Sequence, residues 1–338
     1  ILAQAILARA ELGARFFTRV GSRVCASTAA RVWAVCIGRC GRLPMFVTDQ
    51  YNHRILRFVK GATNGIVVAG GRGPGDDLQQ LNNPRGLAIE PESKALFIAD
   101  CDNNRILRWE WDAQEGEVVC GGNGPGDGLD QLKGPRSMLL EASGALLICD
   151  VWNHRVLRWR PGEPQGELVA GGRGSGSKLS QLRWPYGLAL DADGVLYVSD
   201  HMNHRVVRWP AGATEGEVVA GGRGAGIDPD QLDAPCGIVF DAFDKLLVCD
   251  AGNHRIMKYE RDAKGKFLQD GECVAGGNLS GYEPFQLSWP FNIALDSRGR
   301  MLIADSQNHR VLRWAPGADR GVVVAGGEGL GAGLNQIG

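Results

Sequence analysis

The 338-residue chain has no apolar run approaching the roughly 20 residues that a membrane-spanning helix needs, so we expect no membrane span. Its nine cysteines show no metal-ligand spacing beyond one C-x3-C at Cys36 and Cys40, which alone is weak evidence for a metal site. The chain also lacks a basic excess, because its formal net charge is −1. General nucleic-acid binders normally carry such an excess, so the charge disfavours that class.

Residues 1–44 differ from the rest, because they hold seven Arg, no Lys and a single acidic residue, Glu11. We interpret residues 1–30 as an Arg-rich leader or linker, helical or disordered, and residues 31–338 as the folded domain. The Arg-rich, acid-poor composition is also typical of transit peptides, so organellar targeting is one alternative; an upstream linker or a degenerate repeat are the others. Because the chain begins at Ile1 rather than Met, we expect it to belong to a longer polypeptide.

One pattern recurs along the chain: D-x-x-N-[HN]-R-[IV] occurs six times, at separations of 51, 50, 50, 50 and 55 residues. Self-similarity at such a period indicates a repeat architecture. An acid, a histidine and an arginine this close together resemble a catalytic cluster, but a catalytic group is needed once and a structural group once per unit. We therefore assign the motif a structural role. Its acid, amide and guanidinium residues are Asp49, Asp100, Asp150, Asp200, Asp250 and Asp305; Asn52, Asn103, Asn153, Asn203, Asn253 and Asn308; and Arg54, Arg105, Arg155, Arg205, Arg255 and Arg310.

Each period holds four short runs rich in Val, Leu and aromatic residues, separated by Gly, Pro, Asp and Asn. In the repeat 171–221 these runs are 187–191, 195–199, 204–209 and 217–220. Short runs with such punctuation predict an antiparallel meander. Six meanders repeated radially, so that each sheet packs on the next, give an all-β, six-bladed β-propeller of four-stranded antiparallel blades.

The recurring residues closely resemble the NHL-repeat family. They are D-x-x-N-H-R-[IV]-[LV]-R-W, followed by E-V-V-A-G-G and then Q-L-x-x-P-x-G-[LI], across residues 45–338. The resemblance, which includes the NHL domains of tripartite-motif-type proteins, implies a six-bladed propeller. It implies little about function, since related propellers bind proteins or RNA, act as sensors, or are occasionally enzymes. Kelch and WD repeats fit less well, because the Gly-Gly closes the last strand of each unit and the single Trp-Asp dipeptide lies in a turn.

Physical roles follow for the motif. We expect the Asp, at the end of the second strand, to accept backbone N–H groups of its own turn, and the Asn to adopt the left-handed conformation. The Arg should bridge carboxylates or carbonyls. The His should form a hydrogen bond between blades, because Asn104 replaces it in the second repeat and an amide keeps such a bond but not acid–base chemistry.

Several cysteines occupy repeat positions that hold Ala, Ser or Thr in other units. Cys149 and Cys249 are two examples, in the second strand. A cysteine that alternates with such residues is interpreted as a small buried side chain. This usage favours a reducing compartment, and we expect an intracellular, cytoplasmic protein.

The first repeat has no recognisable innermost strand. Counting back 15 residues from Asp49 reaches Ala34, where the other repeats have Pro. Either the apolar run RVWAVCI (31–37) fills this place or a strand beyond Gly338 does. We favour 31–37, because an open inner edge is a liability.

In a four-stranded blade, the second-to-third turn and the link to the next blade lie on the same face. The link from Gly-Gly to the next Pro has the same length in every repeat, whereas extra residues at 90–94 and 260–270 fall on the opposite face. Loops of fixed length with variable side chains suit a binding surface. Arg, Tyr, Trp and Met are enriched at the hot spots of protein interfaces. The alternative is that these side chains pack between blades or line the central channel. The predicted binding residues are Arg85, Arg136, Tyr186 and Phe291 after the Pro, and Tyr51, Trp152 and Met202 inside the turn.

The sequence offers little evidence for a phosphate-binding, metal-binding or catalytic site. The G-x-G patterns of the links lack the following helix that a phosphate loop requires. His201, the single His outside the motif, and Cys101 at the equivalent turn position are weak support for a metal. We therefore predict no catalytic residue, metal or cofactor, and a monomeric scaffold that docks a protein or peptide on the face with fixed links. The alternatives are RNA binding through Arg85 and Arg136, with Tyr186 and Phe291 as stacking groups, and a metal-dependent lyase or hydrolase.

Overall fold

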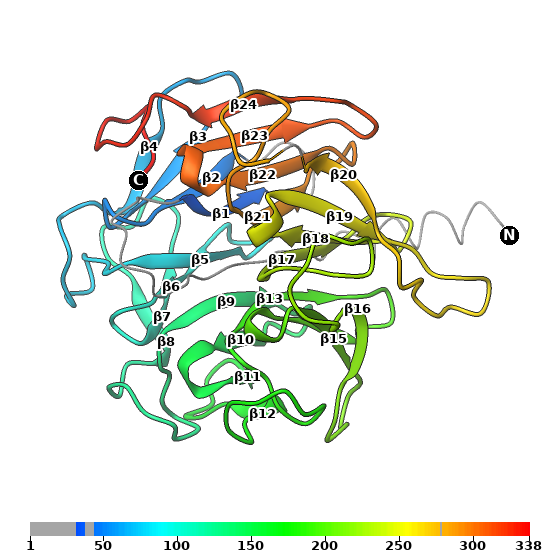
Figure 1. Ribbon diagram of the computed structural model, residues 1–338. Helices are drawn as coiled ribbons and strands as arrows, with labels where there is room; N and C mark the ends of the chain where they lie inside the picture. The colour runs from blue at the N-terminus through cyan, green and yellow to red at the C-terminus, as the bar shows by residue number, and fades with distance from the viewer. Residues whose placement is uncertain (1–31, 38–43, 278) are drawn as a thin grey trace, which may run out of the picture.

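The computed structural model describes residues 32–37, 44–277 and 279–338. These residues form six four-stranded antiparallel sheets arranged as the blades of a ring (Figure 1). The predicted all-β, six-bladed propeller is therefore confirmed. Chain order follows blade order, so the first and last blades lie side by side where the ring closes.

The strands of each blade run in sequence from the channel outward. Blades 1 to 3 comprise β1 (Val32–Ile37), β2 (Met45–Asp49), β3 (Arg54–Phe58) and β4 (Ile66–Gly70); β5 (Pro84–Ile89), β6 (Leu96–Asp100), β7 (Arg105–Trp109) and β8 (Glu117–Gly121); and β9 (Pro135–Leu140), β10 (Leu146–Asp150), β11 (Arg155–Trp159) and β12 (Glu167–Gly171). Blades 4 to 6 comprise β13 (Pro185–Leu190), β14 (Leu196–Asp200), β15 (Arg205–Trp209) and β16 (Glu217–Gly221); β17 (Pro235–Phe240), β18 (Leu246–Asp250), β19 (Arg255–Tyr259) and β20 (Glu272–Gly276); and β21 (Pro290–Leu295), β22 (Met301–Asp305), β23 (Arg310–Trp314) and β24 (Gly321–Gly326).

The core lies between the blades, because each inner sheet face packs on its neighbour. One cluster joins Ala88 and Phe97 of blade 2 to Met138 and Leu146 of blade 3. The second strand β10 is buried along its whole length, whereas the outer strand β12 exposes its first two residues. Cys149 and Cys249 are fully buried among these apolar residues, as predicted for the small-residue positions. Across the described segments, no helix is long and apolar enough to cross a membrane.

The turn after the second strand is a short 3-10 helix in four blades. These helices are η1 (Val151–Asn153), η2 (His201–Asn203), η3 (Ala251–Asn253) and η4 (Ser306–Asn308). The residue with left-handed backbone is the following His, such as His154 with φ 54°, and Asn104 takes the same place with φ 54°. The prediction that the motif Asn adopts this conformation is therefore wrong. The Asn stays in the helical turn, which points its amide back toward the Asp, and the chain reverses one residue later.

Strand β1 fills the innermost position of blade 1. It pairs antiparallel with β2, with Val35 opposite Val47 and Ile37 opposite Met45. It also lies against β5 and β21, the innermost strands of the neighbouring blades. Val32–Ile37, which lies within the run 31–37 favoured from the sequence, is thus the closing strand.

Candidate binding face

The motif Asp, Asn and Arg form one hydrogen-bonded unit, which we call the clamp. In blade 3, Asp150 Oδ1 accepts the backbone N–H of Lys133 at 2.7 Å. Asp150 Oδ2 accepts Asn153 Nδ2 at 2.8 Å and Arg155 Nε at 2.7 Å. The prediction that the Asp binds N–H groups of its own turn is therefore wrong. The N–H belongs to the link that enters the blade, because the buried carboxylate faces that link.

The Asn and Arg of the clamp bind the same link through its carbonyl oxygens. Asn153 Nδ2 donates to Gly126 O at 2.7 Å. Arg155 donates from Nη1 to Asp127 O at 2.6 Å and from Nη2 to Gly128 O at 2.7 Å. The predicted bridging role of the Arg is confirmed. Each clamp fixes a link backbone in place, so the face formed by the links and the second-to-third turns, here called the clamp face, is rigid.

Blade 1 uses its clamp to close the ring. Its partner is the segment 326–338, which follows blade 6, so the join between the last and first blades is noncovalent. The same geometry that fixes five links thus also fastens the segment after blade 6 to blade 1. The bonds are Asn52 Nδ2 to Gly331 O at 2.9 Å, Arg54 Nη2 to Gly333 O at 2.8 Å and Gly338 N–H to Asp49 Oδ1 at 2.7 Å.

The clamp carboxylates are fully buried ion-pair partners of their arginines. Burial raises the pKa of Asp250 to about 6, while the donors Asn253 and Arg255 and the backbone N–H of Asp233 act in the opposite direction. Burial likewise raises the pKa of Asp150. Both carboxylate oxygens of Asp150 accept hydrogen bonds from structural donors, so this acid holds the scaffold.

The motif His forms the predicted bond between blades. His154 Nδ1 accepts the backbone N–H of Trp184 in the next link at 3.3 Å. In the second repeat, Asn104 Oδ1 accepts the equivalent N–H of Gly134 at 2.9 Å, which confirms why the amide can replace the imidazole. An accepting Nδ1 carries no proton, so the neutral imidazole is protonated at Nε2. The other pairs are His53 with Asn83, His204 with Ala234 and His254 with Trp289.

His154→Asn should fold normally and lose part of the acid sensitivity of the wild type. Burial and the nearby Arg183 lower the pKa of His154 in the folded protein. As the pH falls below about 6.5, the unfolded chain binds a proton before the folded one does, so this His contributes stability at neutral pH that is lost toward acid. Asn does not titrate. Melting temperatures from pH 8 to pH 5 should be similar at the alkaline end and favour the variant at the acid end; parallel curves would contradict this role.

The four predicted residues after the Pro lie in the channel and are buried. Arg136 Nη1 donates to Tyr186 OH at 2.7 Å, and its guanidinium lies 5.1 Å from the Tyr186 ring. Burial lowers the pKa of Arg85 to about 10 and raises the pKa of Tyr186 to about 12. The expectation that Tyr186 and Phe291 are exposed at the channel entrance is wrong, since both are fully buried. The innermost strands converge closely enough for these side chains to pack on one another.

The predicted turn residues are nearer the surface. Tyr51 is 46% exposed and Trp152 is 37% exposed, and Met202 is partly buried. Trp152 meets Trp184 edge to face, with ring centroids 5.1 Å apart, and the guanidinium of Arg136 lies 5.6 Å from the Trp152 ring. Trp184 was not among the predicted residues. The available signal was a Trp directly before the link Pro, a position that holds Asn, Gly or Ala in three other repeats and Trp289 in a fourth.

The residue before the link Pro has a left-handed backbone in five blades. Gly134 has φ 59° and Asn83 φ 56°, which those residues adopt readily. Trp184 has φ 56° and Trp289 φ 50°, and such strain in a bulky residue costs on the order of 1–3 kcal/mol and clusters at functional sites. The two tryptophans are therefore the bulky residues in this set, and the backbone does not explain their identity.

A model of the NHL repeat matches residues 182–209, which run from the end of one link through the motif of blade 4 to the end of β15. The other five blades repeat the same motif and the same clamp. The match and the six-bladed fold support the NHL-repeat family. No curated protein matches the chain.

Solved structures share the fold of this NHL propeller at low identity. A catalytically inactive virginiamycin B lyase from Staphylococcus aureus is 11% identical, with TM-score 0.54, over 90% of this chain and 88% of that one. A gluconolactonase from Xanthomonas campestris is 16% identical, with TM-score 0.54, over 86% and 93%. An auxiliary nutrient binding protein from Bacteroides ovatus is 15% identical, with TM-score 0.58, over 90% and 78%. At these identities the likeness concerns the fold alone.

The weak metal candidates of the NHL propeller lie in its interior. His201 is fully buried, with Nδ1 3.2 Å from Pro235 O and 3.4 Å from Cys236 Sγ. Its ring packs on Tyr186, with centroids 4.1 Å apart. Cys101 is also buried. Within the described part of the chain, no three His, Cys, Asp or Glu side chains gather as a metal site would require.

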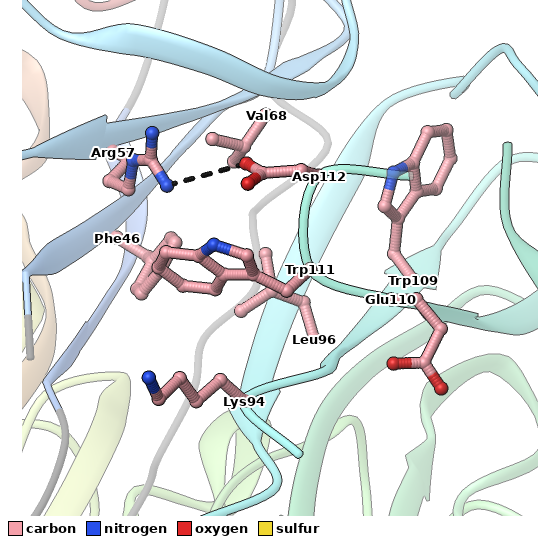
Figure 2. Close-up of a pocket in the computed structure, with 9 residues that line it drawn as sticks. All are labelled: Phe46, Arg57, Val68, Lys94, Leu96, Trp109, Glu110, Trp111 and Asp112. Atoms are coloured by element: carbon pink, nitrogen blue, oxygen red, sulfur yellow. Dashed lines mark ion pairs between the residues drawn. The ribbon is translucent and has the colours of Figure 1, made fainter. Parts of the chain in front are cut away.

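A small pocket lies on the face opposite the clamps, between blades 1 and 2. Figure 2 shows the Trp111 ring lying between Arg57 and Lys94, whose cationic groups are 4.8 and 5.7 Å from the ring centroid. Phe46 meets the same ring edge to face at 6.1 Å. The cavity left is about 10 Å³, roughly the space of one water molecule. The Trp111 ring therefore fills most of this pocket, and it packs blade 2 against blade 1.

Proposed function

We propose that this NHL propeller is a non-catalytic scaffold that binds a protein or peptide on its clamp face. The observation that carries the proposal is that the side chains of this face form two groups, one bonded to the link backbones and one exposed. The acids, amides and guanidinium groups of the clamps are committed to the link backbones, as Asp150 and Arg155 illustrate. The exposed side chains between them, such as Tyr51 and Trp152, are of types enriched at protein interfaces.

A rigid backbone supports this proposal. Binding costs the ordering of loops and side chains at an interface, and a surface that is already ordered avoids part of that cost. Each clamp fixes the link that enters its blade, as Arg205 does through Ser177 O at 2.9 Å and Lys178 O at 3.1 Å. The alternative of RNA binding relied on Tyr186 and Phe291 as stacking groups, and their burial removes that basis.

Photo-crosslinking from single positions tests the proposal. A crosslinking amino acid would replace one exposed residue on each of several blades of the clamp face, namely Tyr51, Asp102 and Trp152. Phe243, which is 81% exposed and lies on the opposite face, is the matched control. We expect protein adducts from at least one clamp-face position, unaffected by nuclease, and none from Phe243. Adducts from the Phe243 control alone, or adducts that nuclease removes, would overturn the proposal.

A further inference from the structure

We propose that the docking site of the clamp face lies over blades 3 and 4 and takes an acidic peptide segment with a bulky apolar residue. This inference rests on the proposed binding function and narrows it to one sector and one chemistry. It starts from the link 171–185, which joins these two blades and contains Trp184, whose ring contacts Trp152.

The link 171–185 is the one basic link of the ring. It contains Arg173, Lys178 and Arg183 and no acidic residue, whereas each of the other five segments, from its Gly-Gly to the next Pro or to Gly338, has more acidic than basic residues. All three bases are exposed. The region after residue 44 has 37 acidic against 30 basic residues. An acidic partner would therefore be attracted to this sector and repelled by much of the remaining surface, which gives selectivity.

Acidic groups flank the basic sector on both sides. The residue two before the link Pro is Arg183 at the entry to blade 4 and Lys133 at the entry to blade 3. The same position is Asp233 at the entry to blade 5. On the blade 2 side, a groove of about 480 Å³ is lined by Asp76 and Asp102 among other residues. The positive charge thus ends within two blades, a span that fits a short peptide better than a nucleic-acid backbone.

The apolar part of the site is the tryptophan pair. Trp152 is placed by the bond from its backbone N–H to Lys133 O at 3.2 Å. Its ring lies against Gly134, where an added Cβ would come 2.2 Å from Trp152 Cδ1. Glycine at that position is therefore required for the ring to lie toward Trp184. The two edge-to-face rings offer an aromatic surface directly beside the basic link, and aromatic residues with adjacent Arg are typical of binding hot spots.

The backbone of Trp184 supports a role for its side chain. The residue has the left-handed conformation that Asn83 and Gly134 adopt at equivalent positions with little strain. A bulky residue retained there needs a reason outside the backbone. Trp289 carries the same strain in blade 6, but its link has Glu283 and no base. The combination of a strained tryptophan and a basic link is found at the entry to blade 4 alone among the residues that the structure describes.

The test uses the full chain and three synthetic peptides of equal length, in which a Trp or Phe anchor is flanked by Glu, by Gln or by Lys. Fluorescence anisotropy should show binding of the Glu peptide, weakened as salt is raised because the bases are exposed. Lys178→Glu with Arg183→Glu should weaken this binding about tenfold or more, whereas Arg72→Glu, a charge reversal in the link that enters blade 2, should leave it within about twofold. Preference for the Gln or Lys peptide, or an equal loss in the Arg72 control, would overturn the inference.

A second pair of variants tests the tryptophan without endangering the fold. Trp184→Asn relieves the left-handed strain and removes the packing of the ring on the core, two effects of opposite sign, so the protein should still fold, yet the change should weaken the Glu peptide about tenfold or more. Trp289→Asn relieves the same strain and should leave binding unchanged. A Trp184→Asn protein that binds normally would overturn the inference. Single-stranded RNA is the competing ligand; RNA bound in place of peptide, and lost in the Lys178, Arg183 variant, would also overturn it.

The outcomes separate this inference from the proposed function. Protein crosslinks confined to other blades of the clamp face would leave the scaffold function intact and defeat the blade 3 and 4 site. Crosslinks restricted to the opposite face would defeat both. Crosslinks from Trp152 that disappear with the Lys178 and Arg183 charge reversal would support both.

Discussion

Replacing Asp150 with alanine should lower the free energy of unfolding by about 3–5 kcal/mol, because it leaves the buried guanidinium of Arg155 without its carboxylate. The change also removes the acceptor for the backbone N–H of Lys133 and for Asn153. An unpaired buried charge costs more than the bond itself, since it cannot regain water. The link that enters blade 3 would then be held by fewer bonds.

Denaturant unfolding of the purified chain measures this change, with His154→Asn as the control in the same blade. The control should stay within about 1 kcal/mol of the wild type, because the amide preserves the bond to the next link, as Asn104 does. Asp150→Asn should fall between the two, since it keeps the shape and loses the charge. An Asp150→Ala protein as stable as the His154 control would show that the clamp does not carry the stability assigned to it.

Removing residues 1–44 should destabilise the ring severely, whereas removing residues 1–28 should leave its melting temperature unchanged. The longer deletion takes away β1, which pairs with β2 and lies against β5 and β21. Its loss exposes an unpaired inner edge and the apolar faces of two neighbouring blades. The free energy of unfolding of a domain is about 5–15 kcal/mol in total. Losing one inner strand of a closed ring should remove a large part of that free energy.

Thermal melts and light scattering distinguish the two truncated proteins. The shorter deletion keeps Val32–Ile37 and should unfold cooperatively without aggregation. The longer one should melt early and scatter light. If the two proteins melt at the same temperature, β1 does not close blade 1, and the assignment of the closing strand is wrong.

Periodicity was sufficient to predict the blades, and turn chemistry was not sufficient to assign roles within them. Four apolar runs per repeat fix the strands, and the variation of His with Asn104 reveals a bond that an amide can make. The left-handed residue was misplaced onto the Asn because spacing does not say where a turn reverses. The burial of Tyr186 and Phe291 depends on how closely six inner strands approach one axis. That distance follows from ring closure, which no single repeat encodes.

The hydrogen bonds that hold each link are made to main-chain N–H and carbonyl groups of that link. Arg155 donates to the carbonyls of Asp127 and Gly128, and Asn153 to that of Gly126, while the side chains of those residues take no part. Selection for a folded ring and selection for a partner therefore act on different atoms of the same segment. The exposed side chains of a link can therefore change while its fastening persists, whereas glycines such as Gly126, where an added Cβ would lie 2.0 Å from Gln131 Oε1, must stay. A combinatorial library restricted to link side chains would exploit the same separation in the laboratory.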